Sequence, residues 1–120
     1  MKNILIVDDS ESIRELVSLT LVAAGYKVDK GSDGLEAIKL LDGREINLVI
    51  TDLNMPNMDG IQLIREIRKK NEYATIPILL LTTESQASKK EEAKSAGATG
   101  WIVKPFVQEK LLEVVKKIIR

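Results

Sequence analysis

The stretch Leu48–Gly60, LVITDLNMPNMDG, decides the fold. Its first four residues, Leu48–Thr51, are apolar or β-branched, which predicts a buried strand. The strand ends on the carboxylate Asp52, and the proline, asparagine and glycine residues that follow predict a loop leading into a helix. Because ligands of open α/β sheets bind beyond the carboxyl ends of the strands, Asp52 is a candidate functional residue. The alternative is that Asp52 only ends the strand in solvent or caps the helix.

Outward from this stretch, short apolar runs alternate with helical patterns along the whole chain. The expected strands are Asn3–Val7, Tyr26–Lys30, Leu48–Thr51, Pro77–Thr82 and Gly100–Val103. The expected helices run from Ser10 to Gly25, from Ser32 to near Gly43, and over Gly60–Lys70, Ser85–Ala96 and Val107–Ile119. Strict alternation with apolar strands is typical of a parallel sheet covered on both faces. We therefore predict an α/β fold, a doubly wound sheet of five strands with five helices, as one domain over residues 1–120.

The spacing of apolar residues predicts which face of each helix is buried. The first helix should bury Ile13, Leu16, Val17, Thr20 and Ala24, and the second should bury Leu35, Ile38 and Leu41. The third should bury Ile61, Ile64 and Ile67. Residues 85–96 are polar almost all round, so this helix should be the least securely packed.

Composition excludes several kinds of chemistry. The chain of 120 residues has 18 basic and 18 acidic side chains, so its net charge favours neither nucleic acid nor an anionic membrane. It has no cysteine and no histidine, which excludes disulfides, thiolate nucleophiles, histidine bases and histidine-bound zinc. No apolar run is long enough to span a membrane and no signal peptide is evident, so we expect a soluble, cytoplasmic protein.

Residues able to do chemistry follow four of the five expected strands. They are Asp8 and Asp9, Asp52, Thr82, and Lys104. The carboxyl ends of parallel strands lie at one edge, so these side chains can converge. Each has a plain structural alternative: a helix cap for the first pair, a loop residue for Thr82 and a solvated charge for Lys104.

Three clustered carboxylates repel one another and either protonate or bind a cation. Carboxylate oxygens suit a hard ion, and Mg²⁺ uses one or two carboxylates with water and phosphate oxygens. With Mg²⁺ and Lys104 the three acids form a neutral site, in which a carboxylate is a plausible nucleophile toward phosphorus. The Thr82 hydroxyl can then donate to a phosphoryl oxygen.

The chain resembles, over all 120 residues, the response-regulator receiver domains of two-component signalling. The resemblance rests on the motifs ILIVDDS, LVITDLNMPNMDG and PILLLTTE and on the triplet Lys104–Pro105–Phe106. With no output domain in the sequence, it is most similar to the stand-alone receivers of the chemotaxis type. The resemblance implies the strand order 2-1-3-4-5.

The resemblance also implies roles for single residues. Asp52 would be the phosphoacceptor, and Mg²⁺ would be held by Asp8, Asp9, Asp52 and the backbone carbonyl of Asn54. Lys104 would pair with the phosphoryl group and be joined to Pro105 by a cis peptide. Thr82 would move toward the phosphoryl group as the first step of a switch. The lifetime of the phosphoryl group would depend on Asn54, Thr83 and Glu84.

The aromatic residue of the switch falls on Trp101, where the family usually has tyrosine, phenylalanine or histidine. Because indole is bulkier and carries an N–H, the usual inward movement is in question, and Trp101 could instead pack permanently against the last two helices. The expected phosphodonor is a histidine kinase. The expected target is a protein, such as a flagellar motor switch or a phosphotransfer protein, bound by a monomer through residues 85–96, 100–103 and 107–119.

Other classes of protein fit less well. A phosphohydrolase with an aspartate nucleophile generally needs a second acid two residues further on, where this chain has Asn54. An FMN-binding flavodoxin needs hydroxyls and amides after the first strand, where this chain has two aspartates. A P-loop NTPase needs a glycine-rich GK[ST] loop, which the sequence lacks.

Overall fold

Five parallel strands form one sheet in the computed structural model, which describes residues 1–119. The strands are β1 (Asn3–Val7), β2 (Lys27–Gly31), β3 (Leu48–Thr51), β4 (Ile78–Thr82) and β5 (Gly100–Val103). They are ordered β2-β1-β3-β4-β5, and every neighbouring pair is parallel. The predicted α/β fold and the strand order implied by the resemblance are therefore confirmed.

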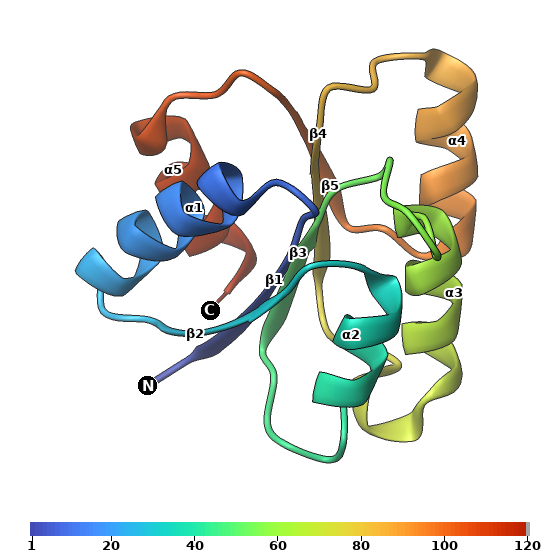
Figure 1. The fold of residues 1–120 in the computed structure, drawn as a ribbon, viewed down its shortest axis with the longest axis horizontal. Coiled ribbons are helices and arrows are strands. Elements are labelled where there is room, and N and C mark those ends of the chain that lie inside the picture. The colour runs from blue at the N-terminus through green and yellow to red at the C-terminus, as the bar shows by residue number, and fades with distance from the viewer. Residues whose placement is uncertain (120) are drawn as a thin grey trace.

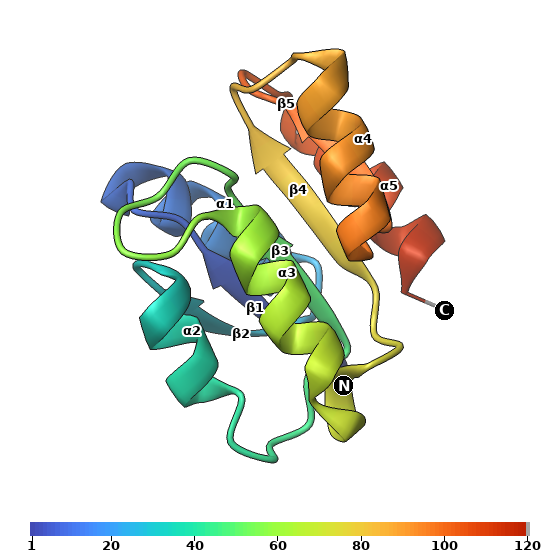
Figure 2. The same ribbon diagram turned by 90° about the vertical axis from the view of Figure 1, so that its right-hand side faces the viewer.

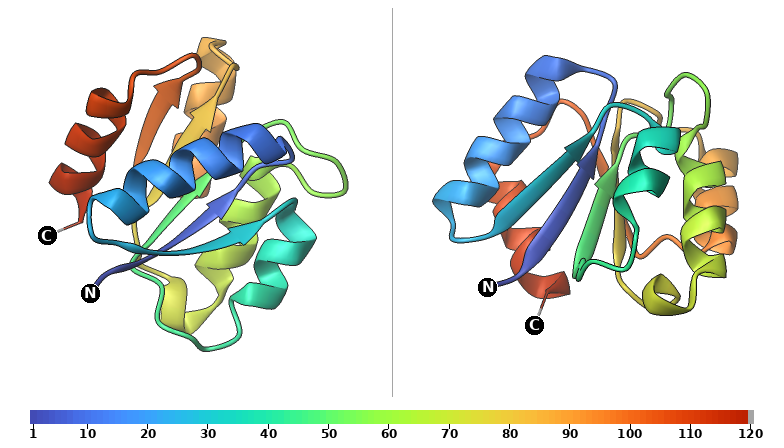
Figure 3. Two further views of the ribbon diagram at one scale, coloured as in Figure 1. Left: turned by 60° about the vertical axis from the view of Figure 1, so that its left-hand side comes forward. Right: turned by 60° about the horizontal axis from the view of Figure 1, so that its bottom comes forward.

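Helices cover both faces of the sheet (Figure 1). They are α1 (Glu11–Ala23), α2 (Gly34–Leu40), α3 (Gly60–Lys69), α4 (Ala87–Ala96) and α5 (Gln108–Ile118), with a short 3₁₀ helix, η1 (Asn71–Tyr73), after α3. Figure 2 shows α2, α3 and α4 in front of one face, and the left panel of Figure 3 shows α1 and α5 on the other. Each face has its own apolar core, so side chains alternate between two cores along the central strands.

The ends of several elements differ from the prediction by a few residues. Helix α2 ends at Leu40 and not near Gly43, because the Asp42 carboxylate accepts a hydrogen bond from the Arg44 N–H (3.3 Å) and forms a turn. Helix α4 begins at Ala87 and not at Ser85, since Glu84 accepts from the Gln86 N–H (3.2 Å). The 3₁₀ helix η1 was not predicted; it buries Tyr73, whose hydroxyl donates to Arg44 O (2.7 Å).

The predicted inner face of α1 is wrong in part. Val17 and Thr20 are buried as expected, but Leu16 is 39% exposed and Ala24 lies past the end of the helix in solvent, while Leu21 takes the inward position. Leu35 of α2 is likewise exposed. The inner face of α3 is correct, since Ile61, Ile64 and Ile67 are all buried.

Helix α4 is attached mainly at its carboxyl-terminal end. Only Ala93 of this helix is buried, and its N-cap Gln86 makes no side-chain capping bond. At the other end Arg68 of α3 donates to Gly97 O from Nε (3.2 Å) and Nη2 (2.7 Å). The same guanidinium donates to Ile76 O before β4 (2.6 Å), so it joins α3, α4 and β4 at one corner of the fold.

None of the helices in residues 1–119 is both long enough and apolar enough to cross a membrane.

Candidate phosphorylation site

Backbone pairing at the carboxyl edge of the sheet sets the positions of the candidate residues. Asp8 follows β1 and donates its N–H to Gly31 O of β2 (3.1 Å), and Asp52 follows β3 and donates to Val7 O (2.9 Å). Lys104 follows β5 and donates to Thr82 O of β4 (2.8 Å). The backbone of Asp8, Asp52 and Lys104 is therefore fixed by a hydrogen bond that continues the strand pairing by one residue.

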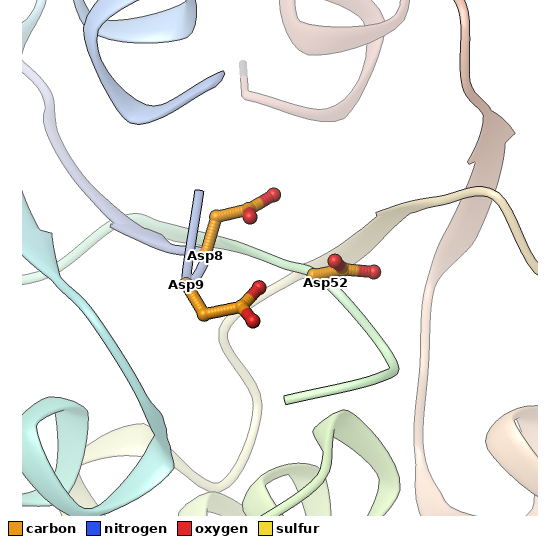
Figure 4. Close-up of side chains that lie close together, drawn as sticks. All are labelled: Asp8, Asp9 and Asp52. Carbon is orange, nitrogen blue, oxygen red and sulfur yellow. The ribbon is translucent and has the colours of Figure 1, made fainter. Parts of the chain in front are cut away.

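Three carboxylates meet at this edge (Figure 4). One oxygen each from Asp8, Asp9 and Asp52 lies within 4.8 Å of the other two. Asp8 and Asp52 are buried, at 2% and 9% exposure, and Asp9 is exposed, so the cluster opens to solvent on the Asp9 side. The structure thus brings together the three acids that the sequence analysis expected to converge.

Lys104 completes the cluster from the other side. Its Nζ lies 2.7 Å from Asp8 Oδ2 and 3.3 Å from Asp52 Oδ2, and its side chain is only 11% exposed. Buried ion pairs of this kind persist where further hydrogen bonds satisfy the oxygens. Here the Ser10 N–H donates to Asp8 Oδ1 (2.9 Å) and the Leu53 N–H donates to Asp52 Oδ1 (2.7 Å).

The charges remain unbalanced. Burial raises the pKa of the Asp8 carboxyl above its ordinary value of 3.8, although the hydrogen bonds from Lys104 and Ser10 oppose this. One lysine against three carboxylates leaves a net formal charge of −2. The donor set is all oxygen, and a hard divalent cation neutralises it, so the residues present fit a metal of the Mg²⁺ type.

The remaining predicted residues differ in how far they are exposed to solvent. Thr82 is fully buried, and its hydroxyl accepts from the Glu84 N–H (3.2 Å). Thr83 is exposed, Glu84 is half-buried and Asn54 is exposed in the loop after β3. The Lys104–Pro105 peptide bond is cis.

Trp101 packs, half-buried, against the core under α2, α3 and α4. Lys90 Nζ of α4 lies 5.7 Å from the centre of its ring, within the range of a cation–π contact. Its indole N–H is buried and has no hydrogen-bond partner among the described residues. A buried donor without a partner is costly.

Two contacts near the site were not predicted. Arg14 Nη1 donates to Asp8 O (2.6 Å), and Asn57 Nδ2 in the loop after β3 donates to Asp33 Oδ2 (2.8 Å). A basic residue near the start of a helix is unfavourable for the helix dipole. The position of Arg14 in the sequence could therefore have indicated that its side chain has a specific partner. No local pattern pairs Asn57 with a residue 24 positions away.

Removing the buried charge at Asp8 should stabilise the metal-free protein. Because the pKa of Asp8 is raised above 3.8 in the fold, its charged form is less favourable there than in the unfolded chain. In EDTA at pH 7 we expect Asp8→Asn to raise the free energy of unfolding by about 1 kcal/mol, measured by urea denaturation. The gain should shrink as the pH falls toward 3.8, where the unfolded carboxyl protonates.

Asp42→Asn is the matched control for this substitution. The hydrogen bond from Arg44 lowers the pKa of the exposed Asp42, so removing its charge should bring no gain in stability. A loss of stability in Asp8→Asn at pH 7 would mean that the ion pair with Lys104 outweighs the burial of the Asp8 charge.

The fold and the site together define a class of protein. A 2-1-3-4-5 parallel sheet with three carboxylates and a lysine at its carboxyl edge is the arrangement of an α/β signalling module that accepts a phosphoryl group on aspartate.

Comparison with known proteins identifies the family. Residues 4–116 match the family described as response regulator receiver domain. Chemotaxis protein CheY-3 of Vibrio cholerae serotype O1 is 40% identical over 116 residues, which are 96% of this chain and 89% of that protein. The chain therefore belongs to the response regulator receiver family and is a signalling module, with a histidine kinase implied as its phosphodonor.

Solved structures show the same similarity. Chemotaxis protein CheY4 of Vibrio cholerae superimposes with a TM-score of 0.95 at 45% identity, over 98% of both chains. The response regulator TrrA of Thermotoga maritima, solved in complex with Mg²⁺ and BeF, gives a TM-score of 0.87 at 39% identity, covering 98% of this chain and 99% of that one.

Proposed function

We propose that Asp52 is the phosphoacceptor, that Mg²⁺ is held by Asp8, Asp9, Asp52 and the backbone carbonyl of Asn54, and that phosphorylation switches a protein-binding surface. The convergence of Lys104 with Asp8 and Asp52 carries the proposal. The presence of Mg²⁺ and BeF in the TrrA complex supports the choice of metal.

The chemistry needs no general base. The ionised Asp52 carboxylate attacks phosphorus; the new P–O bond forms as the P–N bond of a phosphohistidine donor breaks, and the electron pair leaves with the imidazole. The chain itself has no histidine to act as a base, and a carboxylate nucleophile requires none. When bound, Mg²⁺ supplies charge neutralisation for the phosphoryl oxygens.

Lys104 has two successive partners in this scheme. Without a phosphoryl group its ammonium pairs with Asp8 and Asp52, at 2.7 and 3.3 Å. When negative charge arrives on Asp52, the same ammonium is already beside it and can bind a phosphoryl oxygen with little reorganisation. The Thr82 hydroxyl, which accepts from Glu84 N–H and keeps its own proton for donation, would turn toward another of these oxygens.

The switched surface would consist of α4, β5 and α5. It contains the loosely packed α4 and, on β5, Trp101. We propose a protein target, such as a flagellar motor switch or a phosphotransfer protein, and a cytoplasmic monomer, by likeness to chemotaxis relatives. Asn54 stands where an aspartate-nucleophile phosphohydrolase would need its second acid, so turnover of other phosphate esters is not proposed.

Beryllofluoride with Mg²⁺ tests the proposal, because Trp101 is the chain's only tryptophan and reports its own surroundings. We expect the ligand pair to change the Trp101 emission and its quenching by acrylamide in the wild type. Asp52→Asn keeps the size of the side chain but should show neither change. An equal change in Asp52→Asn would overturn the assignment of Asp52, and no change in either protein would mean that Trp101 does not move.

The side chains beside the site should set the lifetime of the phosphoryl group. Asn54 is exposed and can hold a water in line with phosphorus, so Asn54→Ala should slow dephosphorylation several-fold. Glu84→Ala and Thr83→Ala should change the rate as well, since both positions follow Thr82. Loss of phosphate can be followed by intact mass, with the exposed Asn71→Ala as the control. Rates equal to wild type in both Asn54→Ala and Glu84→Ala would contradict this.

A further inference from the structure

The loop after β3 carries two of the candidate metal ligands, the Asp52 carboxylate and the Asn54 carbonyl. Both ends of this loop are fixed by backbone hydrogen bonds. Asp52 N–H donates to Val7 O (2.9 Å), and Gly60 N–H donates to Leu53 O (2.7 Å). Asn54 lies between these anchors and is exposed. Its position therefore depends on what holds the outer part of the loop, residues 55–58.

That outer part lies against the amino-terminal end of α2, where Figure 2 shows the green loop beside the start of the helix. Asn57 Nδ2 donates to Asp33 Oδ2 (2.8 Å). Beside this bond Met58 covers Gly34, and a Cβ on Gly34 would stand only 2.7 Å from Met58 Cβ. The two contacts set the spacing between loop and helix.

Both carboxylate oxygens of Asp33 accept hydrogen bonds. Oδ1 accepts from the Glu36 N–H (2.8 Å) as the N-cap of α2, while Oδ2 accepts from Asn57. These hydrogen bonds lower the pKa of Asp33, so it is charged at neutral pH and the bond from Asn57 is charge-assisted. Asn57 has a φ of 70°, a conformation that asparagine adopts more readily than most residues.

The chain just before Asp33 also contacts the backbone at Asp8. Asp33 lies two residues after Gly31, whose carbonyl accepts from the Asp8 N–H (3.1 Å). The end of β2 thus contacts the backbone at Asp8 through Gly31, and two residues later Asp33 contacts the outer part of the loop after β3 through Asn57.

We propose that Asp33 and Asn57 are positioning residues for the metal site, which hold the loop after β3 so that the Asn54 carbonyl faces the carboxylates. This inference rests on the proposed Mg²⁺ site. Neither residue contacts the metal in this scheme, and the effect passes through the loop backbone.

Exchanging the two partners tests the proposal. Asn57→Asp should place two carboxylates against each other, and in the metal-free protein the loop can move to relieve their repulsion. Mg²⁺ binding requires the loop to return, so we expect the Kd for Mg²⁺, measured by isothermal titration calorimetry, to rise about fivefold. The added negative charge alone would have the opposite effect on a cation. In the double variant Asp33→Asn with Asn57→Asp, the amide and carboxylate have changed places, and the amide oxygen at position 33 still caps α2. We expect its Kd to return to within about twofold of wild type.

Asn71→Asp is the matched control, an asparagine-to-aspartate change at an exposed position in η1, beyond the opposite end of α3. Its Kd should equal that of wild type or be slightly lower. Unfolding in EDTA is measured for every variant, and titrations are made where circular dichroism shows each to be folded. If Asn57→Asp is less stable but binds Mg²⁺ with the wild-type Kd, or if the double variant binds no better than Asn57→Asp, the positioning role is overturned. If the wild type itself binds no Mg²⁺, the proposed metal site fails instead.

Discussion

Treatment with acetyl phosphate and Mg²⁺ should add one phosphoryl group to the wild-type protein and none to Asp52→Ala. The expected effect is a complete loss, because the nucleophile itself is removed. Asp8 cannot replace it: this side chain is more deeply buried than Asp52 and its Oδ2 is engaged with Lys104 at 2.7 Å. Asp9 is exposed, and within residues 1–119 the ion pairs of Lys104 go to Asp8 and Asp52 instead. Intact-mass spectrometry at several times after mixing measures the adduct directly.

Asp42→Ala is the control for this measurement, since Asp42 is an exposed aspartate paired with Arg44, with no part in the cluster. It should be phosphorylated like the wild type. Lys104→Ala should be phosphorylated more slowly, because the ammonium that meets the incoming phosphoryl oxygens is missing. An adduct on Asp52→Ala equal to that on the wild type would contradict the assignment of Asp52 as the phosphoacceptor.

Mg²⁺ should also stabilise the fold, and Asp9→Ala should abolish that stabilisation. Gathering three carboxylates beside one lysine costs free energy that a divalent cation offsets. At about 100 times its Kd, Mg²⁺ should add about 2.7 kcal/mol to the free energy of unfolding, measured by urea denaturation with and without EDTA. Asp9 is the informative position because it is exposed, so its truncation removes a ligand and little packing.

The neighbouring Glu11 supplies a control for the metal effect. It is an exposed acid in the first turn of α1 but is not a member of the carboxylate cluster. Glu11→Ala should keep the full Mg²⁺-dependent gain, with at most a small loss of stability from the helix dipole. A wild-type protein whose unfolding is indifferent to Mg²⁺, or an Asp9→Ala protein with the full gain, would refute the proposed ligand set.

The sheet and its functional edge could be predicted because both depend on local patterns. Runs such as Leu48–Thr51 are too short and too apolar for a surface helix, and in a parallel sheet the residue after each strand must reach the same edge. Asp8, Asp52 and Lys104 were therefore accessible from the sequence. The family resemblance supplied the strand order, which apolar patterns leave open.

Other features depend on contacts between distant segments and were missed. Leu16 has the helical spacing of an inward residue. The rotation of α1 about its axis instead exposes Leu16 and buries Leu21 against the sheet. The bond from Asn57 to Asp33 has no signature in either local sequence, since both residues also satisfy ordinary turn and cap patterns. Position along the chain predicts which residues can reach the edge, while tertiary packing decides which of them meet.

The hydrogen bonds of Arg68 fix the carboxyl-terminal end of α4 but not its amino-terminal end. The Arg68 guanidinium holds Gly97 O from two nitrogens, and the helix buries Ala93 one turn before that point. The opposite end, at Gln86, has no capping side chain and lies two residues after Glu84, whose N–H is held by the Thr82 hydroxyl. A small rotation of Thr82 would release this near end while the far end stays fixed. The displacement would then be largest near residues 86–90 and would fade toward Gly97, so Lys90 would slide across the face of Trp101.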